Sequence, residues 1–430
     1  MDCIEYIYEP YNLVSDEESE AENVDTLAII VSGIGSIQNK CVVKRKARTC
    51  YIRLDMVAYM HQHLNDPYFD KTIRTNRTSF DRLVTMLTPS LLVDEEMARR
   101  RGGNITPTMC LYLTLRYLAG GSHHDIMNHL GISMASFYRC LTKTKLAICN
   151  CAELDIVFPS SQRELELISN GFEQVTLKQS LPNVVGAVDG YLLSINTPSR
   201  SEVGNVKSYF SGHYQKYGLN VQAVCDSSCM FLYFAVSGQG SSNDRVAIHH
   251  KLDGISLSDR IEALPGNFVV VADAAYKPTE HVVPIFYGTQ RKFADNDNFN
   301  FVASQCRIRI EMAFGILQSK WRILRRPLEV SVRRARIIAN TIARLHNFVI
   351  KEQHNCVYNE IRAANEVDRF DQTTPNVHDD PQFPIPPASN LSLYVNMAQS
   401  TSIIRDAMVQ RIKRFGATRP SQNMVANNNE

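Results

Sequence analysis

The sequence predicts an α/β protein in which a sheet is covered by helices, preceded by an all-helical segment. Two changes in periodicity support this prediction. From about residue 51 to 150, apolar residues recur three and four positions apart, which is the spacing of amphipathic helices. After about residue 180, short apolar or alternating runs separated by polar turns are followed by helical patterns. That order is typical of a helix-covered sheet.

Length and composition limit the class of protein. A chain of 430 residues is long enough for two or three domains. No run reaches the eighteen apolar residues of a membrane helix, and the N-terminal MDCIEYIYEP lacks the positive charge of a secretory signal. Eleven scattered cysteines, an odd number, indicate reduced thiols in the cytosol or nucleus. We therefore expect no membrane association.

Charge is distributed unevenly although the net charge is only +2. Residues 1–39 contain no Lys or Arg, whereas residues 301–351 hold eleven Lys and Arg against two carboxylates. Such asymmetry indicates a polyanionic partner.

The two ends of the chain are predicted to contain little structure. Residues 1–50 form an acidic, largely disordered segment with a basic cluster, KRKAR, at 44–48. This cluster suits a nuclear import signal, a phosphate-contacting patch or an ordinary solvated surface. Residues 26–37 are apolar without an assignable role. Residues 355–430, rich in proline and polar residues, are predicted as a flexible tail with one helix at 402–415.

The predicted helical domain, residues 51–150, ends in a helix, a tight turn and a second helix. The stretch SHHDIMNHLGISMASFYRCLTKTKLAI, 122–148, turns at Gly131 with helix-turn-helix spacing. A plain helical hairpin inside a bundle explains the pattern equally well. In the first case, the residues that face DNA are Ser133, Ser136, Tyr138 and Arg139.

The catalytic core is predicted within residues 180–350. NVVGAVDGYLLSINTP indicates a buried strand, a turn and an alternating strand, and three further strands are indicated by KYGLNVQAVCD, CMFLYFAVSGQ and GNFVVVADAAY. We expect a helical stretch at 243–264, a loop at 277–303, and helices at 304–324 and 335–350.

Three carboxylates stand out in this core. Asp189 and Asp273 each close an apolar run, where a buried carboxylate is costly unless it is paired or binds a metal. Asp226 ends a third strand but leads into a polar turn, which indicates turn chemistry. Glu311 lies at the edge of an apolar helical stripe, and its own helix favours a surface salt bridge with Arg307, four residues earlier.

A metal site explains the aspartates better than two isolated caps do. Hard cations such as Mg²⁺ or Mn²⁺ take oxygen ligands, and a two-metal phosphodiester site needs about three converging carboxylates. Asp189 and Asp273 supply two of them, and Glu311 is the leading candidate for the third.

The order of these motifs carries a family resemblance. GAVDG, ADAAY and R-x-x-x-E-x-x-F-G, with Glu311 following Asp273 by 38 residues, resemble the DDE transposases of the PIF/Harbinger group, which includes the Harbinger transposase-derived nucleases. The resemblance covers roughly residues 110–350 and extends to NVQAVCD, GQGSSND, WRIL and LHN. Two segments depart from the family pattern: HYQKYGLN lacks an expected arginine, and ADAAY replaces a Gly-Asp-Ser-Gly-Tyr-like motif.

The resemblance implies a ribonuclease-H-like core in which Asp189, Asp273 and Glu311 hold two Mg²⁺ or Mn²⁺ ions. It implies a metal-dependent DNA endonuclease and transposase that cuts and joins transposon ends. We expect DNA contacts from Arg307, Arg309, Lys320, Arg322, Arg325, Arg326, Lys216 and Arg139.

The same resemblance implies partners and a location. These are double-stranded DNA with terminal inverted repeats, a Myb-like DNA-binding protein, further copies of the chain, and the nucleus. The alternative is a domesticated derivative that binds DNA or protein without cutting. An unrelated metallophosphatase or RNA nuclease is a third hypothesis.

Overall fold

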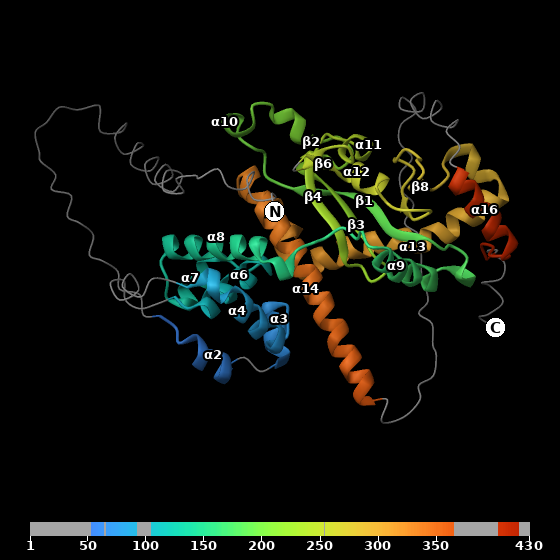
Figure 1. The fold of residues 1–430 in the computed structure, drawn as a ribbon. Helices are drawn as coiled ribbons and strands as arrows, with labels where there is room; N and C mark the ends of the chain where they lie inside the picture. The colour runs from blue at the N-terminus through green and yellow to red at the C-terminus, as the bar shows by residue number, and fades with distance from the viewer. Residues whose placement is uncertain (1–52, 64–65, 93–104, 253, 365–402, 421–430) are drawn as a thin grey trace, which may run out of the picture. The chain divides into compact units, whose positions relative to one another are not determined.

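Residues 54–150 contain only helices and the turns between them wherever the computed structural model describes them (Figure 1). The structure describes residues 53–63, 66–92, 105–252, 254–364 and 403–420. The predictions for residues 1–50 and for most of the tail therefore lie outside the described residues. The helices are α2 Met56–His63, α3 Asp66–Ile73, α4 Arg77–Leu91, α6 Pro107–Leu118, α7 His123–Leu130 and α8 Met134–Asn150.

Helices α7 and α8 form the predicted helix, tight turn and second helix, an arrangement that fits both a helix-turn-helix and a helical hairpin. Ser122 and Ser133 cap the two helices by accepting backbone N–H groups, and Gly131 between them has a φ of 62°, the left-handed region that glycine tolerates best. One face of α8 is buried against α6, α4 and the later helix α14. Tyr138 and Arg139 remain exposed near its start.

The sheet has six strands in the order β4–β3–β1–β7–β8, with the short β2 pairing beside the start of β3. Strands β1, β3 and β4 are antiparallel, whereas β1, β7 and β8 are parallel. The strands are β1 Val184–Ser194, β2 Phe210–Ser211, β3 Lys216–Cys225, β4 Phe231–Gln239, β7 Val269–Ala272 and β8 Val282–Pro284.

Strand β1 is continuous, so the turn predicted inside NVVGAVDGYLLSINTP is wrong, and Asp189 lies within a strand rather than at its end. The antiparallel register with β3 runs unbroken from Ala187 to Ser194, and Gly190 pairs with Gln222. Gly190 is needed for close packing rather than for a turn, because a Cβ there would lie 1.9 Å from Asp244 Oδ1.

Three long helices pack on the sheet, and one of them, α14, also contacts the helical segment. Helix α13, Ala294–Lys320, contacts β1, β3 and β7, and α9, Gln162–Val175, contacts β1. Helix α14, Val332–Ala364, packs on both β4 and α8, as Figure 1 shows. All described residues belong to one compact unit that begins at Tyr51.

Several element boundaries differ from the predictions. Helix α9 was not predicted, and α14 extends well beyond the predicted 335–350. The region predicted as helical, 243–264, contains α11 Asp244–Ala247, the small hairpin of β5 Lys251–Leu252 and β6 Ile255–Ser256, and α12 Leu257–Glu262. No helix among the described residues is long and apolar enough to cross a bilayer.

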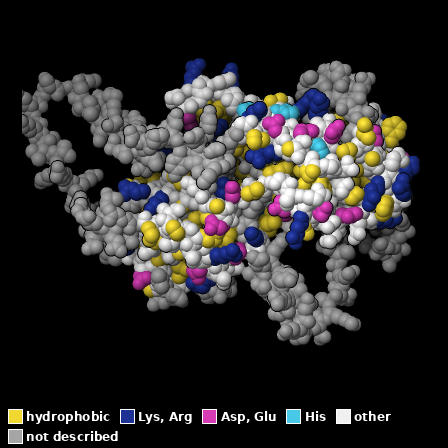
Figure 2. All heavy atoms as spheres, viewed as in Figure 1, with side chains coloured by type: hydrophobic (Ala, Val, Ile, Leu, Met, Phe, Trp, Pro, Cys, Tyr) yellow, Lys and Arg dark blue, Asp and Glu magenta, His cyan; other side chains and the backbone are white. Residues whose placement is uncertain are grey.

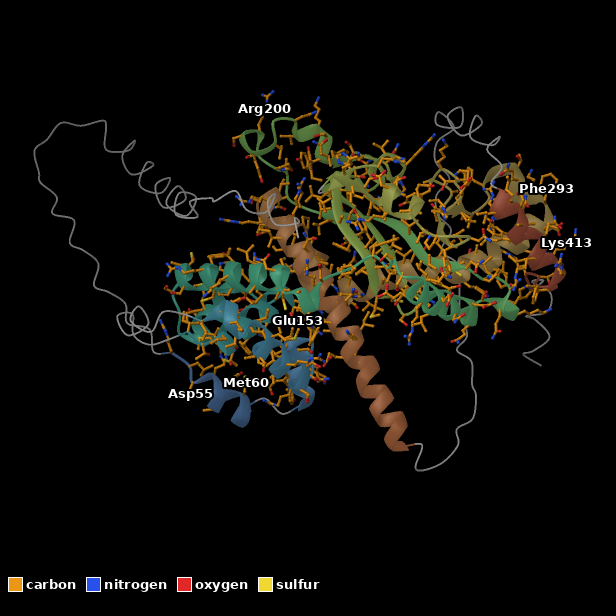
Figure 3. All side chains as sticks on the ribbon, viewed as in Figure 1. Asp55, Met60, Glu153, Arg200, Phe293 and Lys413 are labelled. Carbon is orange, nitrogen blue, oxygen red and sulfur yellow. The ribbon has the colours of Figure 1, made fainter. Side chains whose placement is uncertain are left out.

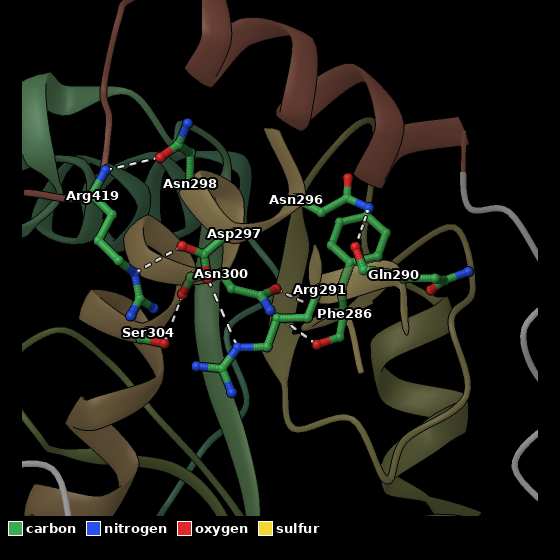
Figure 4. Close-up of polar contacts among 9 residues, drawn as sticks. All are labelled: Phe286, Gln290, Arg291, Asn296, Asp297, Asn298, Asn300, Ser304 and Arg419. Carbon is green, nitrogen blue, oxygen red and sulfur yellow. Dashed lines mark hydrogen bonds and ion pairs between the residues drawn. The ribbon is translucent and has the colours of Figure 1, made fainter. Parts of the chain in front are cut away.

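The stretch 277–303 was predicted as a loop but contains β8 and the first turns of α13. Those turns are polar, which hides the helical pattern, and specific side-chain bonds hold them (Figure 4). Asn300 bonds both the N–H and the C=O of Phe286, at 2.8 and 2.9 Å. Arg419 forms an ion pair with Asp297 at 3.1 Å and donates its backbone N–H to Asn298.

The tail helix predicted at 402–415 is confirmed as α16, Ile403–Arg414, which packs on α13. Lys413 bonds Asp295 at 2.8 Å, and both Lys413 and Phe293 lie at this end of the molecule (Figure 3). Lys and Arg side chains gather over α16 in Figure 2. This part of the predicted flexible tail is therefore anchored to the core.

Candidate functional site

Asp189 and Asp273 lie next to each other at the centre of the sheet. Strands β1 and β7 are adjacent and parallel, with Val188 paired to Ala272, so each aspartate follows one member of the same pair. Asp189 is half-buried, and its Oδ1 accepts the Gly190 N–H at 2.8 Å. Two carboxylates from separate segments therefore share one position in the fold.

The surroundings make the charged form of Asp189 unfavourable. Burial raises the pKa of Asp189 to about 7, and the negative charges of Asp244 and Asp273 raise it further. The Gly190 N–H and the Arg307 guanidinium act in the opposite direction, but do not compensate fully. This position has an excess of negative charge that a bound cation would relieve.

Asp244 is the acidic residue at this site that sequence reasoning missed. Its Oδ1 accepts hydrogen bonds from Asn220 Nδ2 at 3.1 Å and from Gln222 Nε2 at 2.8 Å. The buried Tyr276 hydroxyl donates to Gln222 Oε1 at 2.8 Å and so fixes the amide that holds Asp244. We call Tyr276, Gln222, Asn220 and Asp244 the amide network.

The sequence did contain a signal for Asp244. Asn220 and Gln222 occupy alternate positions of an otherwise apolar strand, β3, and both are buried. Buried amides require partners, and an acid elsewhere in the chain was a natural candidate. Asp244 itself begins α11 after the cap Asn243, directly after a Gly- and Ser-rich stretch.

Glu311 is paired with an arginine in this structure. Its side chain is 41% exposed and pairs with Arg307, the salt bridge that its own helix favours. Because Arg307 also lowers the pKa of Asp189, its guanidinium acts on both Glu311 and Asp189. The structure thus brings Asp189, Asp273 and Asp244 near one another and holds Glu311 on an arginine.

The carboxylate oxygens of the three aspartates are suitable ligands for a hard divalent cation. Carboxylate oxygens are the ligands that Mg²⁺ and Mn²⁺ prefer, and the aspartates here carry charge that neighbouring cations only partly neutralise. Within the described ranges, no three His, Cys, Asp or Glu side chains are close enough to form a closed metal site. Binding would therefore require the carboxylates to draw together.

The predicted DNA-contacting residues are dispersed. Arg309 faces away from Arg307, on the side of α13 that contacts Cys229, and Lys320 lies at the end of α13. The others are exposed on three separate elements: Arg139 on α8, Lys216 at the start of β3, and Arg322, Arg325 and Arg326 in and after the short 3₁₀ helix η5, Arg322–Arg325.

Some motif residues have structural roles. His346 donates Nε2–H to the Cys229 carbonyl at 2.8 Å, and burial lowers its pKa to about 4, so it stays neutral. Asn347 bonds both backbone groups of Phe231 at 2.7 Å. Asp226 accepts the N–H groups of Ser228 and Met230, which confirms the predicted turn.

The sheet order, with three antiparallel strands followed by two parallel ones, is consistent with the ribonuclease-H-like core that was predicted. Residues 188–347 match the profile of the family described as DDE superfamily endonuclease. This segment contains Asp189, Asp244, Asp273 and Glu311, and it ends at Asn347.

Curated relatives agree with this match. The proteins named "Putative nuclease HARBI1" from Xenopus laevis, Bos taurus and Rattus norvegicus are 28%, 26% and 25% identical over 194, 165 and 179 residues. These alignments cover 45%, 38% and 41% of this chain and 52%, 44% and 48% of the relatives, so the chain spans about half the length of the relatives it matches. No solved structure matches. The predicted family resemblance is thereby confirmed: residues 188–347 match the DDE superfamily endonuclease family, and the chain is similar to the Harbinger-derived nucleases.

Proposed function

We propose that the chain is a divalent-metal-dependent DNA endonuclease that cuts and joins transposon ends by two-metal phosphodiester chemistry. The observation that carries this proposal is the placement of Asp189 and Asp273 on adjacent parallel strands, with Asp244 near enough to raise the pKa of Asp189. The match of residues 188–347 to an endonuclease family supports it.

Asp189, Asp273 and Glu311 would hold Mg²⁺ or Mn²⁺, with Asp244 as a fourth acidic group. Bound metal supplies an activated water or hydroxyl and stabilises the leaving oxygen. The amide network fixes the Asp244 carboxylate on one oxygen. Glu311 must leave Arg307 to contribute, and the released guanidinium would then be available to a DNA phosphate.

The remaining elements of the proposal concern the biological setting. The substrate is double-stranded DNA bearing terminal inverted repeats, and a Myb-like DNA-binding protein and further copies of the chain take part. The site of action is the nucleus. Residues 51–150 serve as an N-terminal helical domain, and the exposed start of α8 presents Tyr138 and Arg139 to DNA.

One observation favours a second candidate, a domesticated factor that binds DNA or protein without cutting it. Glu311 is held by Arg307 in an ion pair, and an inactive site is expected to hold it in this way. The two candidates differ in whether Glu311 ever exchanges its arginine for a metal ion.

Nicking of supercoiled plasmid by the full chain separates the candidates. We expect relaxation of the plasmid with Mg²⁺ or Mn²⁺ but not with EDTA, and loss of this activity in Asp273→Ala. Glu262→Gln, at the end of α12, is the control and should cut like the wild type. Equal activity of Asp273→Ala and wild type, or no metal-dependent nicking by the wild type, would contradict the nuclease proposal.

A further inference from the structure

Four arginines from three segments meet where the helical segment adjoins the end of α13. Arg74 follows α3, Arg116 lies in the last turn of α6, and Arg322 and Arg325 belong to η5. Burial lowers the pKa of Arg74, and the positive charges of Arg322, Arg325 and Arg116 lower it further. None of the four forms an ion pair with any residue that the structure describes. We call these residues the arginine cluster.

Two unusual backbone positions bring the arginine cluster together. Arg74 has a φ of 67°, a left-handed conformation in which glycine is less strained than any other residue. Gly120 has a φ of 95°, and a Cβ there would lie 3.0 Å from Arg322 Cβ, so a glycine is needed for η5 to approach the end of α6. A strained arginine among like charges has a cost to folding, which indicates a role outside folding.

The arginine cluster borders an open cleft of about 690 Å³. Arg74, Lys71 and Lys320 line it, and burial lowers the pKa of Lys320 to about 8. The two carboxylates of the cleft interact with basic residues. Glu352 forms an ion pair with Arg82 at 2.6 Å, and the negative charge of Asp70 raises the pKa of Lys320 against the effect of burial. The other polar side chains are hydroxyls and amides that suit phosphate oxygens: Thr75, Asn76, Ser79, Ser228, Ser319 and Gln353.

We propose that the arginine cluster, with the adjoining cleft, binds the phosphate backbone of double-stranded DNA at a distance from the acidic site. Guanidinium groups without acidic partners match phosphate oxygens in geometry and charge. The identity of the polyanion as DNA rests on the proposed function.

Helix α13 sets the spacing between this surface and the acids. It runs from Arg307, which acts on Asp189, to Lys320 in the cleft. At about 1.5 Å per residue this separation is roughly 20 Å, or about six base pairs of duplex at about 3.4 Å each. Lys320 follows Arg309 by eleven residues and shares its face of α13, so the cleft and the acids lie on different faces of this helix.

The test measures binding rather than cutting. A fluorescently labelled 30-base-pair duplex is titrated with the full chain in EDTA by fluorescence anisotropy, over a series of NaCl concentrations. Each phosphate contact contributes about 0.9 to the slope of log K against log salt. We expect the slope to become less negative, by about 2 in the double variant Arg322→Ala/Arg325→Ala and by about 1 in Arg74→Gly.

Arg74→Gly keeps the test interpretable because glycine suits this φ, so its melting temperature should equal or exceed that of the wild type. Arg163→Ala, an exposed arginine on α9, is the matched control and should leave the slope unchanged. Unchanged slopes in both cluster variants, or no duplex binding by the wild type at low salt, would overturn the inference. A synthetic peptide of residues 16–25, DEESEAENVD, serves as a competing polyanion. The inference would also be overturned if this peptide bound the wild type more tightly than the cluster variants while duplex binding was the same in all of them.

The outcome is separable from that of the proposed function. Asp189→Asn should bind the duplex with the wild-type slope even where it cannot cut. If the chain never nicks DNA but the salt dependence of duplex binding is weaker in the cluster variants, the arginine cluster is supported and the nuclease is rejected. If the chain nicks DNA but the salt dependence is unchanged in the cluster variants, the nuclease is supported and the arginine cluster is rejected.

Discussion

Asp189→Asn should make the metal-free protein more stable at neutral pH. The pKa of Asp189 is raised from an ordinary 3.8 to about 7, so the folded protein at pH 8 carries a carboxylate charge that its surroundings disfavour. Asparagine removes that charge and retains an oxygen to accept the Gly190 N–H. At about 1.4 kcal/mol per pH unit, the shift corresponds to at most about 4 kcal/mol in the free energy of unfolding.

The sign of the effect follows from proton binding. Below pH 4 the carboxyl is protonated in both the folded and the unfolded chain, so wild type and variant should have similar stability. Between pH 4 and 7 the folded chain keeps the proton and the unfolded chain loses it, so wild-type stability falls as the pH rises. Above pH 7 the difference should be complete and constant.

Urea unfolding in EDTA from pH 5 to pH 8.5, followed by circular dichroism, measures this difference. We expect the variant to gain stability over the wild type across this range, and added Mn²⁺ to stabilise the wild type alone at pH 8. A variant that is equal to or less stable than the wild type at pH 8 would refute the assignment of Asp189 as a half-buried carboxylate whose charge is not fully compensated.

Three further predictions concern the residues around the acids. Gly190→Ala places a Cβ 1.9 Å from Asp244 Oδ1, so plasmid nicking should fall about 10- to 100-fold, whereas nicking at the wild-type rate would show that Asp244 has no role. Tyr276→Phe leaves Gln222 Oε1 without its donor, and the free energy of unfolding should fall by about 1–3 kcal/mol, with a higher Mn²⁺ concentration needed for half-maximal nicking. An unchanged Mn²⁺ requirement would limit Tyr276 to a structural role. Asn347→Ala removes two bonds to the Phe231 backbone and should cost about 1–3 kcal/mol in urea unfolding, and a loss below 0.5 kcal/mol would contradict this anchoring role.

Local patterns were sufficient to predict Asp273 and the turn at Asp226. Strand β7 is a short, fully apolar run, so the position where it ends is plain in the sequence. The motif order identified the family resemblance, and the turn between α7 and α8 was predicted from Gly131. These features depend on residues close together in the chain.

The errors concern contacts between distant segments. Asp189 was placed at a strand end because it closes an apolar run, yet the strand continues through Gly190, which makes room for Asp244, 54 residues later in the chain. The start of α13 was missed because its polar first turns are stabilised by Phe286 and Arg419, which no local pattern reveals. Glu311 was ambiguous in sequence because the same helix positions permit both its salt bridge and a metal contact.

A crystal of the full chain soaked in Mn²⁺, measured for anomalous scattering, tests the central claim most directly. We predict Mn²⁺ bound between the carboxylates of Asp189 and Asp273, with Glu311 released from Arg307. Glu311 still paired with Arg307, and no manganese at the two aspartates, would contradict the account.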